Sequence, residues 1–296
     1  MAPQWTPVFP DGIGIVDTLI GFVHPDLKEA YRWVTSRTRD PVQLESPVEF
    51  LFKDVPDKRL KDVADRVGLT LAEMDRWGVE VGLVGVNEPG DDGDQAVRRY
   101  PERFVASTGA DPNDGAAAVD KVTRAYEMWG IRAVTLFPAG TTPPVAINDP
   151  AMFPIYATCV ELGLPVFCTA GVPGPRLPFA TQHVALIDDV MFEFPDLVFV
   201  TRHGCEPWAD LAVKLMLKWP GLHYSTSGFA PRYYPDDVVR YANTRGADKV
   251  LYAGYFPFGL TLERIMTELV GLELRDEVWP KFLRTNALRI LGLIPP

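Results

Sequence analysis

The segment MWGIRAVTLFP, residues 128–138, contains the pattern that decides the fold. An amphipathic stretch comes first, Gly130 follows it, and an apolar run begins at Ile131. A glycine just past a helix end takes the left-handed conformation that turns the chain into the next element. The same junction recurs in RWGVEV (76–81) and ELGLPVF (161–167). The chain therefore repeats a unit in which a helix, a glycine and a strand follow one another.

Short apolar runs recur along the whole chain and alternate with amphipathic stretches. Their continuous Val, Leu, Ile and Phe content is typical of strands covered on both faces, as in a parallel sheet. Eight such strands over roughly 250 residues predict an α/β protein with a closed (β/α)₈ TIM barrel. An open doubly wound sheet is the alternative, although it usually has fewer strands, and neither G-x-G-x-x-G nor G-x-x-x-x-G-K-[ST] is present. The runs are residues 12–17, 79–86, 103–111, 131–138, 164–171, 197–204, 222–228 and 249–257.

No low-complexity segment or clear linker divides the chain, so we expect one domain over residues 1–296. Residues 38–76 are less regular and more charged than their surroundings. We interpret them as an irregular or helical excursion between the first two strands. Such an excursion would cover the barrel mouth or form a subunit contact.

Composition excludes several classes of protein. The net charge is −10 and Lys and Arg are not clustered, which argues against a nucleic-acid groove or an anionic membrane surface. Three cysteines are too few for a disulfide framework, which favours a reducing compartment. The N-terminal residues do not resemble a signal peptide, and no run approaches the roughly 20 apolar residues of a membrane span. We expect a soluble, cytoplasmic protein.

Three strand-end residues are candidates for catalysis, because reacting groups in such barrels line the carboxyl ends of the strands. His203 is a candidate acid, base or hydrogen-bond donor, since imidazole titrates near neutral pH. Asp17 would orient a partner or act as a base, or else be a buried carboxylate that binds backbone N–H groups. Tyr255 is a phenol that stays neutral at pH 7, so it would donate a hydrogen bond.

Further strand-end and loop residues are candidates for binding the substrate. Arg202, and Arg176 in the Pro-rich loop GVPGPRLP, would hold an anionic group, because guanidinium meets carboxylate in bidentate geometry. The alternative for both arginines is a surface ion pair. Cys168 lies in an apolar run without an adjacent cation, so a small buried hydrophobe is the better interpretation than a nucleophile. Thr169, Ser227 and His24 complete the predicted binding set.

The four histidines do not form a local metal pair, because no two are spaced as i, i+2 or i, i+4. A zinc site assembled from His24, His203 and a carboxylate remains an alternative.

Several motifs occur in the order seen in one known family. They include RRYPERFVASTGADPNDG (98–115), FPDLVFVTRHGCEPW (194–208), GADKVLYAGYFP (246–257) and NALRILGL (286–293). In these motifs the chain resembles the amidohydrolase-related family, in the branch of aminocarboxymuconate semialdehyde decarboxylase and the resorcylate-type decarboxylases. The resemblance implies a metal-dependent-hydrolase-like (β/α)₈ barrel, commonly with one divalent metal in the mouth.

The family's metal motif is replaced in this chain. Its first strand ends Asp-x-His-x-His, where this chain has DTLIG, with Leu19 and Gly21 at the histidine positions. Thr169 stands at the position of a further histidine, and Tyr255 stands at that of an aspartate; His203 is retained. Leu, Gly, Thr and Tyr do not hold zinc in its normal geometry, so we expect no metal and no other cofactor.

The resemblance implies a hydrolase or a non-oxidative carboxy-lyase, here independent of metal, acting on a small carboxylate- or carbonyl-bearing substrate at the barrel mouth. The first alternative is a ligand-binding pseudoenzyme, and the second is a partner subunit that assembles through residues 38–76. Apart from a small-molecule substrate, we expect a homodimer or a higher homo-oligomer.

Overall fold

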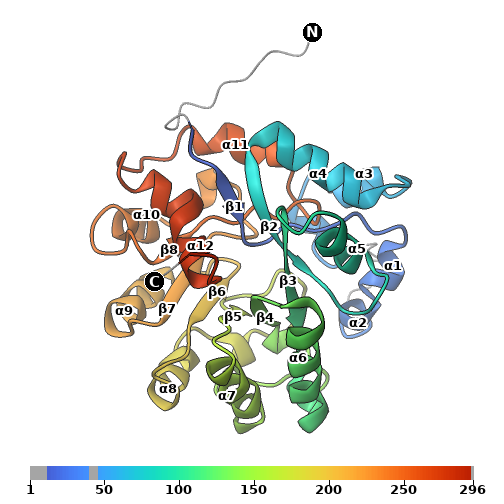
Figure 1. Ribbon diagram of the computed structural model, residues 1–296. Coiled ribbons are helices and arrows are strands. Elements are labelled where there is room, and N and C mark those ends of the chain that lie inside the picture. Colours follow the sequence, from blue (N-terminus) through green and yellow to red (C-terminus); the bar gives the residue numbers. More distant parts are fainter. Residues whose placement is uncertain (1–11, 40–45, 295–296) are drawn as a thin grey trace.

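The computed structural model describes residues 12–39 and 46–294, which form eight parallel strands surrounded by helices (Figure 1). Each strand pairs with the next one along the chain, in the order β1 to β8. All eight predicted strands are present and the predicted (β/α)₈ barrel is confirmed. The strands are β1 (Ile15–Asp17), β2 (Val79–Gly85), β3 (Phe104–Gly109), β4 (Ala133–Leu136), β5 (Val166–Thr169), β6 (Phe199–Arg202), β7 (Leu222–Ser225) and β8 (Val250–Leu251).

The barrel is closed by hydrogen bonds between the segments that follow β1 and β8. The backbone N–H of Gly21 donates to the carbonyl of Phe256 at 2.9 Å, and that of Tyr255 donates to the carbonyl of Leu19 at 3.0 Å. The first and last parts of the chain therefore meet at the carboxyl ends of their strands.

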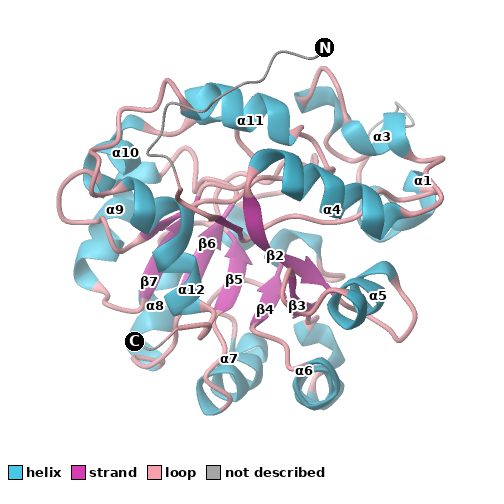
Figure 2. Ribbon diagram, turned by 45° about the horizontal axis from the view of Figure 1, so that its top comes forward, coloured by secondary structure: helices cyan, strands magenta, loops and turns pink. Residues whose placement is uncertain are grey.

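Helices cover the outside of the strands, as Figure 2 shows from a second direction. Short 3-10 helices at Glu49–Leu51, Pro112–Asp114, Pro138–Gly140, Pro150–Met152, Ala180–Gln182 and Pro231–Tyr233, and a π-helix at Lys281–Thr285, complete the elements. No helix in the described ranges is both long and apolar enough to cross a membrane. The α-helices are α1 (Leu27–Ala30), α2 (Arg32–Thr35), α3 (Pro56–Leu60), α4 (Arg66–Trp77), α5 (Asp92–Arg99), α6 (Ala116–Trp129), α7 (Phe153–Glu161), α8 (Leu186–Glu193), α9 (Ala209–Lys218), α10 (Asp236–Ala242), α11 (Leu262–Leu269) and α12 (Asn286–Ile290).

The predicted glycine junctions have the expected backbone conformation. Gly78, Gly130 and Gly163 follow the ends of α4, α6 and α7 with φ of 70°, 59° and 65°. This left-handed geometry redirects the chain from a helix toward the next strand, and glycine adopts it without steric cost.

The amino-terminal end of the barrel is closed by α12. The inner cluster of buried residues joins strand residues such as Val16 and Phe167 to Ala287 and Leu291 of the C-terminal segment. The side chain of Asn286 donates to the carbonyl of Val250 at 2.9 Å, at the start of β8. The opposite end, where the strands finish, is the one left to form a cavity.

The excursion predicted at residues 38–76 contains a short 3-10 helix, α3 and α4; residues 40–45 of it lie outside the described residues. The helix α4 is regular and packs on β2 and α11, so it belongs to the outer helical layer. Residues 47, 48 and 50–53 line a cavity at the carboxyl ends of the strands. This part of the excursion therefore forms some of the cavity wall at the barrel mouth, and its role as a cover of the mouth or as a subunit contact stays a prediction.

Candidate active site

A large cavity opens at the carboxyl ends of the strands, with a volume of about 1560 Å³. Gly109, Leu136, Thr169 and Arg202, each the last residue of its strand, form part of its wall. The predicted residues Thr169, Arg176, Arg202, His203 and Tyr255 all line it. Five of the nine predicted site residues are thus brought to one cavity by the fold.

His203 begins a turn of left-handed backbone that follows β6. The φ angles of His203, Gly204 and Cys205 are 63°, 87° and 58°. The backbone N–H of His203 donates to Ser227 Oγ at 3.1 Å, and the buried hydroxyl of Tyr224 donates to the carbonyl of Gly204 at 2.7 Å. Non-glycine residues adopt this conformation only where their surroundings hold them, and such strain is common at functional sites.

The imidazole of His203 packs edge-on against the ring of Tyr255, with 5.3 Å between ring centroids. Gly228 leaves room for it, because a Cβ at that position would lie 2.7 Å from His203 Nδ1. Burial, together with the nearby Arg202 cation, lowers the pKa of His203 to about 4. The ring is therefore neutral at pH 7, where it has one donor and one acceptor nitrogen.

Tyr255 has a left-handed backbone too, with φ of 109°. Its ring packs against those of Phe52 and Phe258, at 5.9 Å and 5.7 Å between centroids. Burial raises the pKa of its phenol to about 12. The hydroxyl thus keeps its proton at all ordinary pH values and is a donor for an oxygen in the cavity.

Arg202 supplies a buried cation at the cavity wall, with 8% of its surface exposed. Its Nη2 donates to the carbonyl of Thr18 at 3.1 Å, and its guanidinium lies 5.0 Å from the centroid of the Phe167 ring. Burial lowers its pKa to about 10, so it stays charged at pH 7. Within the described part of the chain its Nε is buried without a hydrogen-bond partner.

Asp17 is fully buried and is not among the described residues that line the cavity. Its Oδ1 accepts from the backbone N–H of Gly254 at 2.8 Å and of Leu19 at 2.9 Å. Its Oδ2 has no hydrogen-bond partner among the described residues. Burial raises its pKa to about 7, against the opposing effects of these two N–H groups and of Arg202. These bonds match the interpretation of Asp17 as a buried carboxylate that binds backbone N–H groups, and its role as a base or orienting group stays a prediction.

Cys168 and Ser227 are buried and also lie outside the described cavity lining. Burial raises the pKa of the Cys168 thiol far above its usual range, which favours the interpretation as a small buried hydrophobe. The Ser227 hydroxyl accepts from the His203 backbone, so it holds the turn in which His203 lies.

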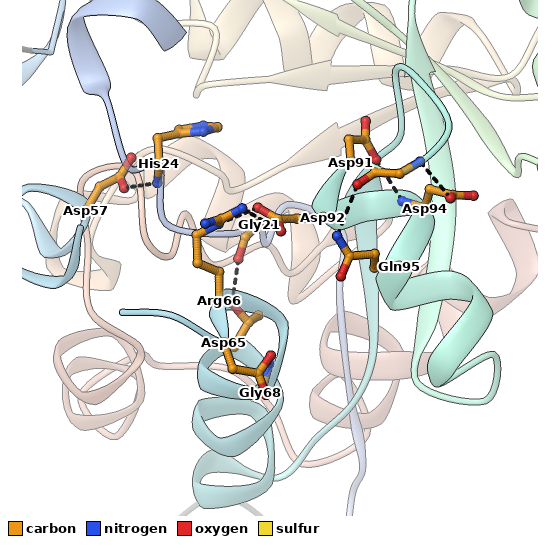
Figure 3. A network of polar contacts seen from close by, with 12 residues as sticks. Gly21, His24, Asp57, Asp65, Arg66, Gly68, Asp91, Asp92, Asp94 and Gln95 are labelled. Atoms are coloured by element: carbon orange, nitrogen blue, oxygen red, sulfur yellow. Dashed lines mark hydrogen bonds and ion pairs between the residues drawn. The ribbon is translucent and has the colours of Figure 1, made fainter. Parts of the chain in front are cut away.

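His24 lies in a network of polar contacts (Figure 3). Its backbone N–H donates to Asp57 Oδ1 at 2.6 Å, and its ring packs edge-on against Tyr31 at 5.9 Å between centroids. Nearby, Arg66 makes two hydrogen bonds to Asp92, at 2.6 Å and 3.0 Å. His24 is outside the described lining, whereas Tyr31 is part of it.

The predicted residue Arg176 is exposed, and its guanidinium lies 4.4 Å from the centroid of the Phe50 ring.

Sequence reasoning missed most of the charged side chains that line the cavity. Among the described residues that line the cavity, six are cationic and three are acidic, in a chain whose net charge is −10. The only signal for the missed cations was their position in segments that follow strands. The cations are Lys53, Lys121, Arg176, Arg202, Arg232 and Arg264, and the acids are Asp111, Asp114 and Glu206.

Comparisons with known proteins place the chain in a family. The sequence model described as amidohydrolase matches residues 91–293, well over half of the chain. This chain belongs to the amidohydrolase family. No curated protein matches it in sequence.

Solved structures confirm the barrel. A TIM-barrel protein from Bordetella bronchiseptica is 23% identical, with a TM-score of 0.75 over 94% of this chain and 98% of that one. A 5-carboxyvanillate decarboxylase from Novosphingobium aromaticivorans is 16% identical, with a TM-score of 0.71 over 95% and 97%. A 2,6-dihydroxybenzoate decarboxylase from Rhizobium is 17% identical, with a TM-score of 0.67 over 95% and 99%. At these identities the likeness establishes the fold.

The prediction that no cofactor takes part is contradicted by these structures. Two structures of the Novosphingobium decarboxylase contain bound manganese. Our prediction rested on replaced motif positions, and a replaced position shows only that the inherited ligand is missing there.

The side chains of this chain do not fit such a metal in the inherited arrangement. Over residues 12–39 and 46–294, His, Cys, Asp and Glu side chains do not form any group of three or more that could hold a metal ion. The family resemblance of the sequence motifs puts Leu19, Gly21, Thr169 and Tyr255 at positions where it implies metal ligands. We therefore derive the chemistry below from the protein's own side chains and route no step through a metal.

Proposed function

We propose that this chain is an enzyme of the amidohydrolase family, a hydrolase or a carboxy-lyase, that acts on a carboxylate- or carbonyl-bearing molecule in the cavity at the carboxyl ends of its strands. One observation carries the proposal. The guanidinium of Arg202 lines the cavity beside His203, is 8% exposed and stays charged at pH 7. A buried cation is costly to leave without an anionic partner, and a carboxylate is the partner that suits a guanidinium best.

The charge around the cavity supports the binding step. Cationic side chains outnumber acidic ones among the described lining residues, although the chain as a whole is acidic. A concave site lined mainly by one sign of charge raises the local concentration of ligands of the opposite sign.

Two hydrogen-bonding groups would act on the bound molecule. Tyr255 would donate a hydrogen bond from its hydroxyl to an oxygen on which negative charge develops, either a carbonyl under attack by water or the enolate left when carbon dioxide departs. His203, neutral at pH 7, would hold the reacting oxygen or pass a proton at one ring nitrogen. Their rings are in edge-on contact, so both groups face the same part of the cavity.

Asp17 would be a positioning residue in this scheme. It is buried, it lowers the cost of the neighbouring Arg202 cation, and it anchors the Gly254 N–H just before Tyr255. We keep Arg176, Thr169, Cys168, Ser227 and His24 as proposed contributors to the substrate site, the last three without direct contact to the cavity.

Product analysis tests the proposal. The protein as purified would be incubated with a panel of ¹³C-labelled carboxylates, esters, amides and lactones, and products would be followed by NMR. Release of labelled bicarbonate indicates a carboxy-lyase, and cleavage of an acyl bond indicates a hydrolase. Binding of panel members without any product contradicts the enzymatic proposal and favours the ligand-binding alternative.

A further inference from the structure

The cavity is larger than a small monocarboxylate needs. Its volume of about 1560 Å³ exceeds the roughly 300–1,000 Å³ of pockets that enclose drug-sized ligands. A ligand held at Arg202 alone would leave much of this space to water. The excess space calls for a longer ligand or a second binding position.

A second cationic position lies on the rim of the same cavity, on the side of β7 and β8. Arg232, in the 3-10 helix after β7, and Arg264, in α11 after β8, both line the cavity. Both pair with the carboxylate of Glu268, and Arg264 Nε lies 3.0 Å from its Oε1. Two guanidinium groups share one carboxylate, so this position keeps a net positive charge.

The two cationic positions differ in depth. Arg202 is 8% exposed at the end of β6, whereas the side chain of Arg232 is 59% exposed. Glu268 is only 11% exposed at its side chain and is not among the described lining residues, so it lies behind the arginines. It holds them in place while their remaining N–H groups stay available to a ligand, as the fork geometry of guanidinium allows.

Apolar wall residues lie beside the second position. Phe229, Leu260 and the ring of Tyr233 line the cavity there, and the Arg232 guanidinium lies 5.8 Å from the Tyr233 ring centroid. Such a wall suits an uncharged, apolar body between two charged ends.

We propose that the ligand of this cavity is an elongated dianion, with one carboxylate on Arg202, an apolar body along the wall, and a second anionic group on the Arg232–Arg264 pair. This inference rests on the proposed function for the Arg202 end. The Arg232–Arg264 position makes a separate contribution that is measured independently.

Calorimetric binding of four chain-length probes to the full chain tests it. The probes are butanoate, butanedioate, decanoate and decanedioate, so that each monocarboxylate has a dicarboxylate of equal length. The long dicarboxylate should bind about fivefold to tenfold tighter than decanoate, because it gains a charge-assisted contact at a partly exposed site. The short pair should differ by less than about twofold, because the inference places the two positions farther apart than the two carboxylates of butanedioate.

Variants identify the position responsible. Replacing both Arg232→Gln and Arg264→Gln should remove the advantage of decanedioate, whereas Arg240→Gln should keep it. Arg240 is a matched control, since it is an exposed arginine paired with Asp237 and is not among the described lining residues. An advantage that is absent, equal in the short pair, or unchanged in the double variant overturns the inference.

The two proposals fail in different ways. If Arg202→Gln leaves butanoate binding unchanged in a protein with wild-type circular dichroism, Arg202 does not bind the carboxylate. The Arg232–Arg264 position is then still tested by the double variant. Arg202→Lys, which keeps the charge, serves where Arg202→Gln does not fold. If Arg202→Gln abolishes butanoate binding and decanedioate gains nothing over decanoate, the anchor stands and the elongated dianion is wrong.

Discussion

Burial determines the protonation of His203 and Tyr255, the residues to which we assign the proposed chemistry. It lowers the pKa of His203 to about 4 and raises that of Tyr255 to about 12, so both are neutral at pH 7. Arg202 keeps its charge, and Asp17 titrates near pH 7. The site therefore combines one fixed cation with two neutral hydrogen-bonding groups, which suits an anionic substrate more than a cationic one.

The imidazole of His203 should resist protonation well below the usual range. An NMR titration of the four histidines, with His203→Gln to identify its signal, should show no protonation of His203 between pH 7 and about 5. The unfolded chain takes up this proton near pH 6.5, so His203 makes the fold lose stability as pH falls from there toward 4. A titration midpoint of His203 near 6.5 would show that the ring is solvated and would contradict the site geometry.

The carboxyl of Asp17 should act on stability in the opposite direction. Its pKa is raised in the fold to about 7, so the folded protein keeps a proton that the unfolded chain loses near pH 4. Stability from this residue is full below pH 4 and is lost as pH rises to 7, by roughly 3–4 kcal/mol.

Asp17→Asn is the matched test of that effect. The amide keeps an Oδ1 acceptor for the N–H groups of Gly254 and Leu19 and has no charge to bury. Urea unfolding between pH 4 and 8 should give a variant whose stability declines less with rising pH than that of the wild type. Parallel curves for the two proteins would mean that Asp17 is ionised throughout.

At the scale of elements, the turn after β6 is held from the neighbouring strand. Tyr224 of β7 donates its buried hydroxyl to the carbonyl of Gly204, in the middle of three residues with positive φ. Tyr224→Phe would leave that carbonyl unpaired and should lower the free energy of unfolding by about 1–3 kcal/mol. It should also shift the His203 resonances, which a loss of stability elsewhere would not do.

Tyr126→Phe is the control for this prediction, because Tyr126 is 39% exposed on the outer helix α6. We expect its stability to stay within about 0.5 kcal/mol of the wild type. If Tyr224→Phe behaves like Tyr126→Phe and leaves the His203 resonances in place, the turn is not supported by this hydrogen bond.

Sequence predicts well those helices and strands that are specified by residues close together in the chain. The glycine junctions at 78, 130 and 163 and the continuous apolar runs specify helices and parallel strands without reference to distant residues. Strand ends then indicate Arg202, His203 and Tyr255, because the carboxyl ends of all strands meet at one mouth. The rim cations Arg232 and Arg264 could not be found this way, since their places depend on how loops and Glu268 pack.

The depth of a residue is equally hard to predict from sequence. Asp17 and Thr169 both end strands, yet only Thr169 lines the cavity, because the side chain of Asp17 is turned to the N–H groups of Leu19 and Gly254. The prediction that no cofactor takes part was wrong for another reason. The sequence of one chain does not show which metals are bound in other proteins of the same fold, and two such structures contain manganese.

At the scale of the whole molecule, the segment after the first strand and the segment after the last strand stabilise each other. Residues after β1 bond to residues after β8, and α12 covers the opposite end of the barrel. We therefore keep the proposal of a single domain and predict one unfolding transition, coincident by circular dichroism and tryptophan fluorescence. Two separated transitions would argue for two domains. Light scattering on the same sample measures whether the predicted homodimer or larger oligomer forms.

The central claim is that His203 acts on a substrate bound in this cavity. The most direct measurement compares the turnover of His203→Ala and His183→Ala on the substrate that product analysis identifies. His183 is outside the described cavity lining and packs its ring on Trp208. The account predicts a loss of about 100-fold or more for His203→Ala and near wild-type turnover for His183→Ala. Equal turnover in the two variants would contradict it.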